Sequence, residues 1–419
     1  MKILIKNAKI FDSTSSYYGQ TLDLFINEGI ITEIGEEILL DVDHTINGEA
    51  IGISQGWVDL KAHFCDPGEE HKETIESGLD AASFGGYNHV AILPSTTPVI
   101  DGKSQVEYIL RRAQNHVTSI YPIGCISKGL KGEELAEMFD MSQCGVKLFS
   151  DDLHSLSSGL MQSALLYAKN FNGIIVAFSR DQSLSKNCLI NEGISSVQTG
   201  LKGEPAIAEI IQIESNLRLT SYTGGRIHFT GISTAEGVRL IKKAKAEGLN
   251  VTADVNAMNL LFTEKELLNF DSNYKVMPVL RTDEDQKALW EGLNDGTIDS
   301  VVSDHRPADH EEKEIEFENA SFGGIQIQTV VPALMANKYC DMNKLFNALS
   351  LNSRAILGID QCSIEIGNRA DISIFDFKKN WIFNDDANLS GSKNSPFYGK
   401  EFSFGVLGTI NKGKLALTE

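Results

Sequence analysis

The sequence predicts an α/β protein: a (β/α)8 barrel with a small β domain formed jointly by the two chain ends. Between about residues 52 and 365, short apolar runs alternate with longer helical patterns, which is typical of β/α units around a parallel sheet. Both chain ends instead alternate apolar and polar residues, as half-buried strands do. A chain of 419 residues, 42% of them hydrophobic, can bury a barrel core and a second, smaller core.

Eight apolar runs in the central region are the predicted barrel strands. They lie at residues 53–60, 89–93, 119–123, 145–149, 173–178, 226–229, 250–254 and 300–304. Between the sixth and seventh runs, Ser233 or Thr234 can cap the start of a helix, and Gly248 can end it. Eight such units in succession specify a closed (β/α)8, or TIM, barrel.

The two chain ends carry the remaining strand patterns. Residues 2–10, 21–26 and 29–34 alternate near the start, and residues 370–376 and 404–410 alternate near the end. Neither end is large enough to fold separately, so we expect their apolar faces to be buried against each other.

Composition and charge exclude several classes of function. Lys and Arg number 37 against 57 Asp and Glu, a net charge of −20, so nucleic acid and anionic membranes are poor partners. The first apolar run is broken by Lys6, too early for a signal peptide, and no apolar stretch approaches the roughly 20 residues that span a bilayer. The six cysteines are scattered without a Cys-x-x-Cys pair, as expected for reduced thiols. We therefore expect a cytoplasmic protein.

The most informative motif ends the first predicted barrel strand, at Asp59-Leu60-Lys61-Ala62-His63-Phe64-Cys65. With the motifs that follow it, the chain resembles dihydroorotase of the bacterial type, a member of the amidohydrolase superfamily. The other matching segments, in family order, are residues 72–78, 93–98, 149–152, 191–193, 251–254, 275–281, 295–299 and 303–307. So many ordered matches make the resemblance specific, although each short motif alone would be weak.

The resemblance implies both fold and chemistry. It implies a TIM barrel at residues 52–365 beside a composite β-sandwich of residues 1–51 and 366–419. It also implies an enzyme of pyrimidine biosynthesis that opens a cyclic amide with a hydroxide activated by one or two zinc ions.

Half of the ligand positions implied by the resemblance hold residues that cannot bind zinc. A protonated lysine has no lone pair to give a metal, phenylalanine has no donor atom, and glycine has no side chain. The retained positions are His63, Asp152 and the strand-eight base Asp304, and the replaced positions are Lys61, Phe178 and Gly231. Without the motif around it, His63 would be read as a histidine packed at a strand end.

Two interpretations of this residual site remain open. The three retained side chains could hold a single metal, or Lys61 could replace a metal ion electrostatically beside Asp152 and Asp304. We expect the second arrangement, with no bound metal. In related hydantoinases a strand-four lysine becomes carboxylated and bridges two metals, and Lys147 lies on the corresponding strand; the alternative is a lysine that extends to solvent or pairs with a nearby aspartate.

The implied substrate-binding positions are altered as well. Cys65 replaces an arginine that would pair with the substrate carboxylate, and a thiol cannot form that bidentate pair. Ser95 and Met277 each replace an asparagine, and Ala308 replaces a histidine. Ligands and substrate contacts are thus lost together, which argues against a simple change of metal.

Two functional hypotheses follow. The first is a catalytically silent, dihydroorotase-like protein with a scaffold or regulatory role, with no cofactor, and with aspartate transcarbamoylase as the partner that the resemblance implies. The second is an active, zinc-dependent cyclic amide hydrolase with an atypical site. In either case we expect a homo-oligomer.

Overall fold

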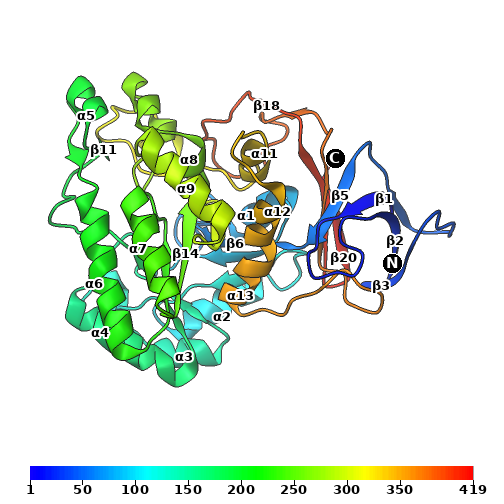
Figure 1. Ribbon diagram of the computed structural model, residues 1–419, viewed down its shortest axis with the longest axis horizontal. Helices are drawn as coiled ribbons and strands as arrows, with labels where there is room; N and C mark the ends of the chain where they lie inside the picture. Colours follow the sequence, from blue (N-terminus) through cyan, green and yellow to red (C-terminus); the bar gives the residue numbers. More distant parts are fainter. Residues whose placement is uncertain (419) are drawn as a thin grey trace.

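The computed structural model describes residues 1–418 and has the predicted architecture, a (β/α)8 barrel beside a small β-sandwich domain (Figure 1). The barrel strands are β6 Trp57–Ala62, β7 Tyr87–Ile92, β8 Ser119–Pro122, β9 Leu148–Phe149, β10 Ile174–Phe178, β13 Ile227–Thr230, β14 Val251–Asn256 and β15 Ser300–Val302. Seven of the eight predicted strands are confirmed with ends that shift by a few residues, and the first, predicted at residues 53–60, begins only at Trp57.

The barrel closes through short contacts between two parallel sheets. One sheet has the order β6-β7-β8, and the other has the order β15-β14-β13-β10-β9. Parallel bridges at Ala62–His305 and at Gly124–Phe149 join them on both sides. The carboxyl ends of all eight strands therefore meet at one face, where the functional sites of such barrels lie.

The first predicted strand was placed incorrectly, because the chain changes sheets at Gly56. Residues before it form β5 Ile51–Gln55, which pairs with the terminal strands, and residues after it form β6. A side-chain carbon at Gly56 would lie 2.2 Å from Asp371 Oδ1 and 2.3 Å from Asn88 Nδ2. Only glycine fits at this junction, and its neighbours come from distant parts of the sequence.

Helices surround the barrel and follow its strands (Figure 1). The helix predicted after the sixth strand is confirmed as α7, where the Thr234 side chain accepts a hydrogen bond from the Gly237 N–H. The helices are α1 Ile75–Phe84, α2 Lys103–Arg112, α3 Met138–Gln143, α4 Ser158–Ala168, α5 Ile194–Thr199, α6 Ile207–Thr223, α7 Ala235–Ala246, α8 Ala257–Leu261, α9 Asp283–Asp295, α10 His310–Lys313, α11 Val330–Met335, α12 Met342–Asn347 and α13 Ser353–Leu357. Short 3-10 helices are η1 Lys128–Leu130, η2 Lys169–Phe171, η3 Glu264–Asn269 and η4 Ser272–Tyr274, and η5 Ala348–Asn352 is a π-helix.

The two chain ends share one sheet (Figure 1). Its order is β20-β19-β16-β5-β1-β2-β3, with β4 paired to β1. The strands of this sheet are β1 Lys2–Ile10, β2 Thr21–Asn27, β3 Ile30–Gly35, β4 His44–Ile46, β5, β16 Ile372–Asp376, β19 Gly405–Asn411 and β20 Lys414–Leu417. Two short strand pairs lie outside it: β11 Ile190–Asn191 with β12 Gly203–Glu204, and β17 Trp381–Ile382 with β18 Glu401–Phe402. The domain boundaries at residues 51/52 and 365/366 remain a prediction.

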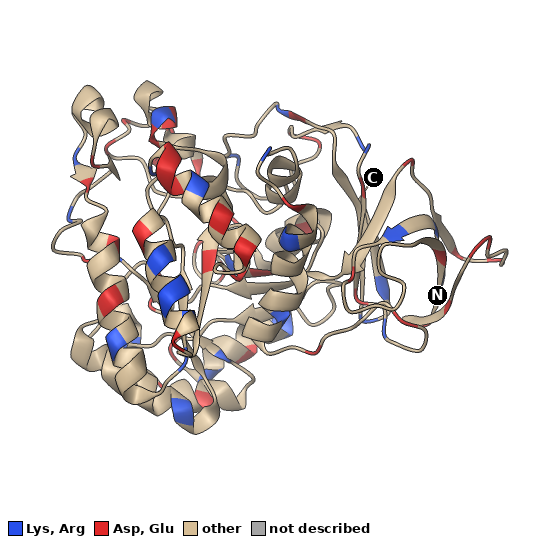
Figure 2. Cartoon of the chain, in the orientation of Figure 1, with Lys and Arg blue, Asp and Glu red and all other residues tan. Residues whose placement is uncertain are grey.

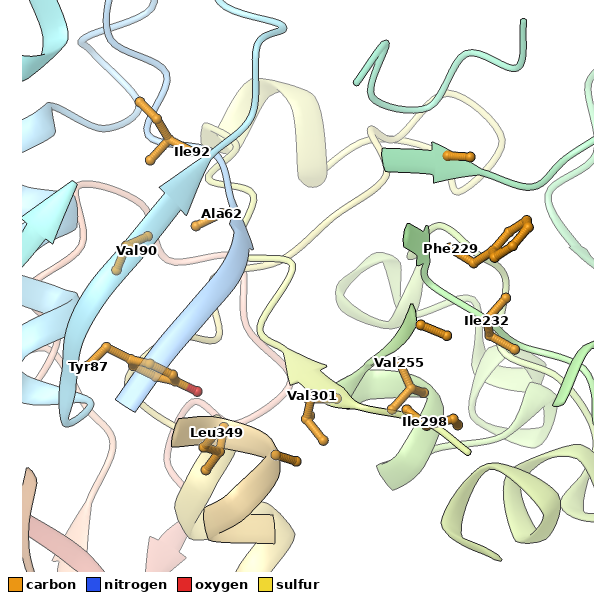
Figure 3. Packing of buried hydrophobic residues seen from close by; sticks show 14 of the residues in the cluster. Ala62, Tyr87, Val90, Ile92, Phe229, Ile232, Val255, Ile298, Val301 and Leu349 are labelled. Atoms are coloured by element: carbon orange, nitrogen blue, oxygen red, sulfur yellow. The ribbon is translucent and has the colours of Figure 1, made fainter. Parts of the chain in front are cut away.

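Two main apolar cores hold these units. The barrel core joins strand side chains such as Val90, Phe229 and Val255 to Leu349 of η5 (Figure 3). The terminal sheet has its own core, rich in isoleucine, from both chain ends. On the outer helices, Lys and Arg are interleaved with Asp and Glu (Figure 2). Within residues 1–418, no helix combines the length and apolar character that crossing a membrane requires.

Candidate functional site

The retained carboxylates meet at the carboxyl face of the barrel, where Arg306 joins them. Arg306 donates from Nη1 and Nη2 to the two carboxylate oxygens of Asp152, with an Nη1–Oδ2 distance of 3.1 Å. Its Nε donates to Oδ1 of Asp304 at 2.9 Å. One guanidinium therefore bridges the carboxylates that follow β9 and β15, and it provides the planar, forked donor geometry that suits carboxylates.

Lys61, at the end of β6, supplies a second cation. Its Nζ lies 3.2 Å from Oδ1 of Asp304, and the two side chains are only 3% and 4% exposed. The ammonium also lies over the ring of Phe178, 5.6 Å from the ring centroid. The expected pairing of Lys61 with a site carboxylate is thus present, and Asp304 is the partner.

Two neutral side chains complete the network. Asn256, the last residue of β14, donates from Nδ2 to Oδ2 of Asp304 at 2.8 Å. Ser95 donates from its hydroxyl to Oδ2 of Asp152 at 2.7 Å. Together with the two cations, these donors occupy all four oxygens of Asp152 and Asp304.

The charges in this network fix the ionisation of Asp152. Burial alone would raise its pKa, but the charge and hydrogen bonds of Arg306, helped by Ser95 and Lys61, hold that pKa well below its usual range. The same two carboxylates raise the pKa of Arg306 above its already high ordinary value, although burial opposes this. Asp152 and Arg306 are therefore a stable ion pair across the whole neutral range.

His63 lies at the same face but faces other partners. Its Nδ1 accepts a hydrogen bond from the Cys65 backbone N–H at 3.1 Å, and its Nε2 lies 3.2 Å from the Ser95 carbonyl. Burial and the positive charge of Arg306 lower the pKa of the imidazole. With Nδ1 accepting and Nε2 donating, the neutral ring has no free lone pair to offer. Cys65 is buried beside it, and burial raises the pKa of the thiol to about 12.

The other replaced positions form an apolar patch. Phe178, Met277 and Val279 pack together, with Leu153 and Phe322 against them. A side-chain carbon on Gly231 would lie 3.1 Å from Pro278 Cδ and 3.6 Å from the Phe178 ring, and the backbone φ there is +68°. A histidine at position 231 would thus be strained in the present backbone.

Lys147 does not lie with these residues. It precedes β9 by one residue, is exposed, and donates to the Gly358 carbonyl at the C-terminal end of α13. Asp152 follows the same strand, so the two side chains belong to opposite ends of the barrel. In this structure Lys147 interacts with the loop after α13, away from the carboxylates.

The residues at the implied zinc positions do not fit a zinc centre. Structural and catalytic zinc sites need three or four lone-pair donors converging on one point. Here Lys61 and Arg306 present N–H groups to the two carboxylates. Phe178 and Gly231 have no side-chain atom with a lone pair that could bind a metal. Within residues 1–418, no three His, Cys, Asp or Glu side chains converge in a way that could hold a metal ion.

Sequence patterns do not single out Arg306 or Asn256, although both are central to the network. Arg306 lies inside the strand-eight motif, two residues after Asp304, and Asn256 closes a strand whose predicted end was Asp254. The sequence signal that could have identified Arg306 is a charged residue within two positions of a retained carboxylate, at the carboxyl end of a barrel strand.

Ala308, at the position where the resemblance implies a histidine, is buried, and its N–H donates to Oδ1 of Asn394 at 3.1 Å.

Comparisons with known proteins agree with this fold and these motifs. Residues 52–237 match the model of the family described as dihydro-orotase-like, and residues 212–416 match the model of the amidohydrolase family. A dihydroorotase of Thermoanaerobacter sp. (strain X514) is 37% identical over 99% of this chain and 97% of its own length. The chain belongs to the dihydroorotase family. A second member, the dihydroorotase of Ruminiclostridium cellulolyticum, is 38% identical over 95% of this chain and 94% of its own.

Solved structures of hydantoinases and dihydropyrimidinases share the fold. An L-hydantoinase (dihydropyrimidinase) from Arthrobacter aurescens superimposes with a TM-score of 0.86 over 99% of this chain and 96% of its own, at 20% identity. A dihydropyrimidinase from Brevibacillus agri NCHU1002 gives a TM-score of 0.81 at 18% identity, over 100% of this chain and 95% of its own. At these identities the likeness concerns the fold, a TIM barrel with a β-sandwich domain.

Proposed function

We propose that this dihydroorotase-family protein is catalytically silent and acts as a scaffold or regulatory subunit in pyrimidine biosynthesis. The carrying observation is that all four oxygens of Asp152 and Asp304 are occupied by donors from Lys61, Arg306, Asn256 and Ser95. In this arrangement the side chain at the family's base position, Asp304, is an acceptor in an ion-pair network, without a free oxygen to take a proton.

We expect dihydroorotate turnover near background, with or without added zinc. A carboxylate acting alone as general base supplies roughly 10²–10⁴-fold, whereas enzymes typically reach 10⁶–10¹⁷-fold. The test is a dihydroorotate hydrolysis assay on purified protein, combined with elemental analysis after dialysis against a mild chelator. The dihydroorotase of Thermoanaerobacter sp., 37% identical, is a suitable positive control. About one zinc per chain together with zinc-dependent turnover would contradict the proposal.

Lys61→His alone should not restore activity, because Arg306 would still bind both carboxylates and Phe178 and Gly231 would still supply no metal ligand. Dihydroorotate turnover by the Lys61→His variant would show that the changes at the other site positions matter less than we infer.

The second candidate function is an active dihydroorotase with an atypical site, and zinc would then be its cofactor. It is favoured by the names of relatives that are 36–38% identical along nearly the whole chain. The same assay separates the two candidates, since only an active enzyme turns over dihydroorotate in proportion to protein concentration.

For the silent protein we propose aspartate transcarbamoylase as partner, a cytoplasmic location and assembly of the chain as a homo-oligomer. Size-exclusion chromatography of the chain with and without aspartate transcarbamoylase from the same organism tests this. We expect a joint, earlier-eluting peak; independent elution of the two proteins at micromolar concentration would contradict the partnership.

A further inference from the structure

Two buried lysines lie at the edge of the barrel mouth, outside the network of Asp152 and Asp304. Lys275 follows η4, and Lys313 ends α10; they are 1% and 4% exposed. Within the described chain, neither ammonium forms an ion pair or donates to a carboxylate. Buried lysines are rarely left without an anionic partner, so this pair requires another explanation.

The two lysines hold two segments together reciprocally. Lys275 donates to the carbonyls of Phe317 at 2.6 Å and Glu318 at 3.1 Å. Lys313 donates in the opposite direction to the Ser272 carbonyl at 2.7 Å, and within its own segment to the carbonyls of Ser321 and Gly323, both at 2.9 Å. Each segment thus contributes an ammonium that binds the other segment's backbone.

The segment held in this way, residues 310–323, contacts the apolar patch of the mouth. Phe322 packs against the cluster of Phe178, Met277 and Val279, and the Lys275 ammonium lies 4.8 Å from the centroid of the Phe322 ring. Half of the segment is exposed, and its buried residues are Lys313, Phe317, Ala320 and Gly323. A segment with so few buried apolar contacts is expected to open locally before the barrel unfolds.

We propose that residues 310–323 form a lid on the barrel mouth, which a clasp of two buried lysines holds closed and which acid loosens. The physical basis is the burial of two like charges in one small volume. Each ammonium is satisfied by carbonyls while the lid is closed, but its charge is desolvated and repelled by its neighbour. Opening the lid returns both charges to water.

The pKa values of the two lysines are lowered in the closed lid, as expected if acid favours opening. Burial lowers the pKa of Lys275 to about 8, with Glu318 opposing, and burial together with Lys275 lowers the pKa of Lys313 to about 7, with Asp271 and Glu312 opposing. An exposed lysine has a pKa near 10.4. The closed lid therefore binds fewer protons than the open lid between about pH 7 and 10, so its closure strengthens as pH rises and weakens as pH falls through this range.

Hydrogen–deuterium exchange of the full chain at pH 6 and pH 9, corrected for the intrinsic pH dependence of exchange, tests the lid. Protection of residues 310–323 should be about tenfold or more greater at pH 9, while protection of α9 should not change. Lys313→Met should reduce this pH dependence. His310→Gln should leave it intact, because His310 is exposed on α10 and pairs with Glu314 outside the clasp.

Equal protection of the lid at both pH values would overturn the proposal. So would an equal change in α9, which would indicate global destabilisation, or an undiminished pH dependence in Lys313→Met. If that variant does not fold, the proposal is still tested in the unmodified chain, by comparing how the protection of the lid and of α9 changes between pH 6 and pH 9. Because the experiment measures hydrogen–deuterium exchange, its result does not depend on whether the protein has catalytic activity.

Discussion

Replacing Arg306 with methionine is expected to lower the free energy of unfolding by about 3–5 kcal/mol at neutral pH, the usual cost of breaking a buried ion pair. The substitution keeps much of the apolar stem but removes the group that binds both oxygens of Asp152 and one oxygen of Asp304. Asp152 would then be a buried carboxylate whose remaining hydrogen-bond donor is Ser95. Urea denaturation of the variant and the unmodified protein measures the loss.

The effect of Arg306→Met should also depend on pH with a defined sign. The low pKa of Asp152 in the folded protein means that its ion pair contributes fully above about pH 4, the range of an ordinary aspartate, and that this contribution is lost as pH falls further. Without Arg306, burial would raise the pKa of Asp152, and protonation would relieve the variant. The difference in stability between the two proteins should therefore shrink as pH falls from 7 towards 4.

A matched control is Arg239→Met, which removes an exposed arginine paired with Glu236 on α7. Exposed pairs contribute little to stability, so its unfolding midpoint should stay close to that of the unmodified protein. If Arg306→Met behaves like Arg239→Met, the bridging guanidinium does not hold the barrel mouth together.

The positions of the network carboxylates were predictable from local patterns, because parallel barrel strands bring their carboxyl ends to one face. Recognising the strand that carries Lys61 near its end, and the strands before Asp152 and Asp304, was therefore enough to place these residues together. The same logic explains Lys147, since a residue at the start of a strand lies at the opposite face from one that follows it.

The partners of those carboxylates could not be predicted in the same way. Arg306 reaches Asp152 across 154 residues of sequence, and the conformation of the loop after β15 decides whether it points inward. The break at Gly56 has a similar cause, since Asp371 and Asn88 approach it from distant segments. Local propensity identifies the elements, but such long-range contacts determine where a strand ends and which donor reaches which acceptor.

Replacing Lys61 with methionine is expected to cost about 3 kcal/mol, the lower end of the range for a broken buried pair. The lower end applies because Asp304 would keep hydrogen bonds from Arg306 and Asn256. Lys287→Met, on an exposed lysine paired at 3.7 Å with Glu291, is the matched control and should leave the melting temperature nearly unchanged.

A double-mutant cycle with Asp304→Asn isolates the Lys61–Asp304 interaction from lost packing on Phe178. If the ammonium stabilises the mouth through the carboxylate, Lys61→Met should cost clearly less in the Asp304→Asn background, with a coupling energy of about 0.5–3 kcal/mol. An unchanged melting temperature in Lys61→Met would show that its charge does not stabilise the site. A coupling near zero would instead assign the role of Lys61 to packing, and Arg306 alone would then balance the two aspartates.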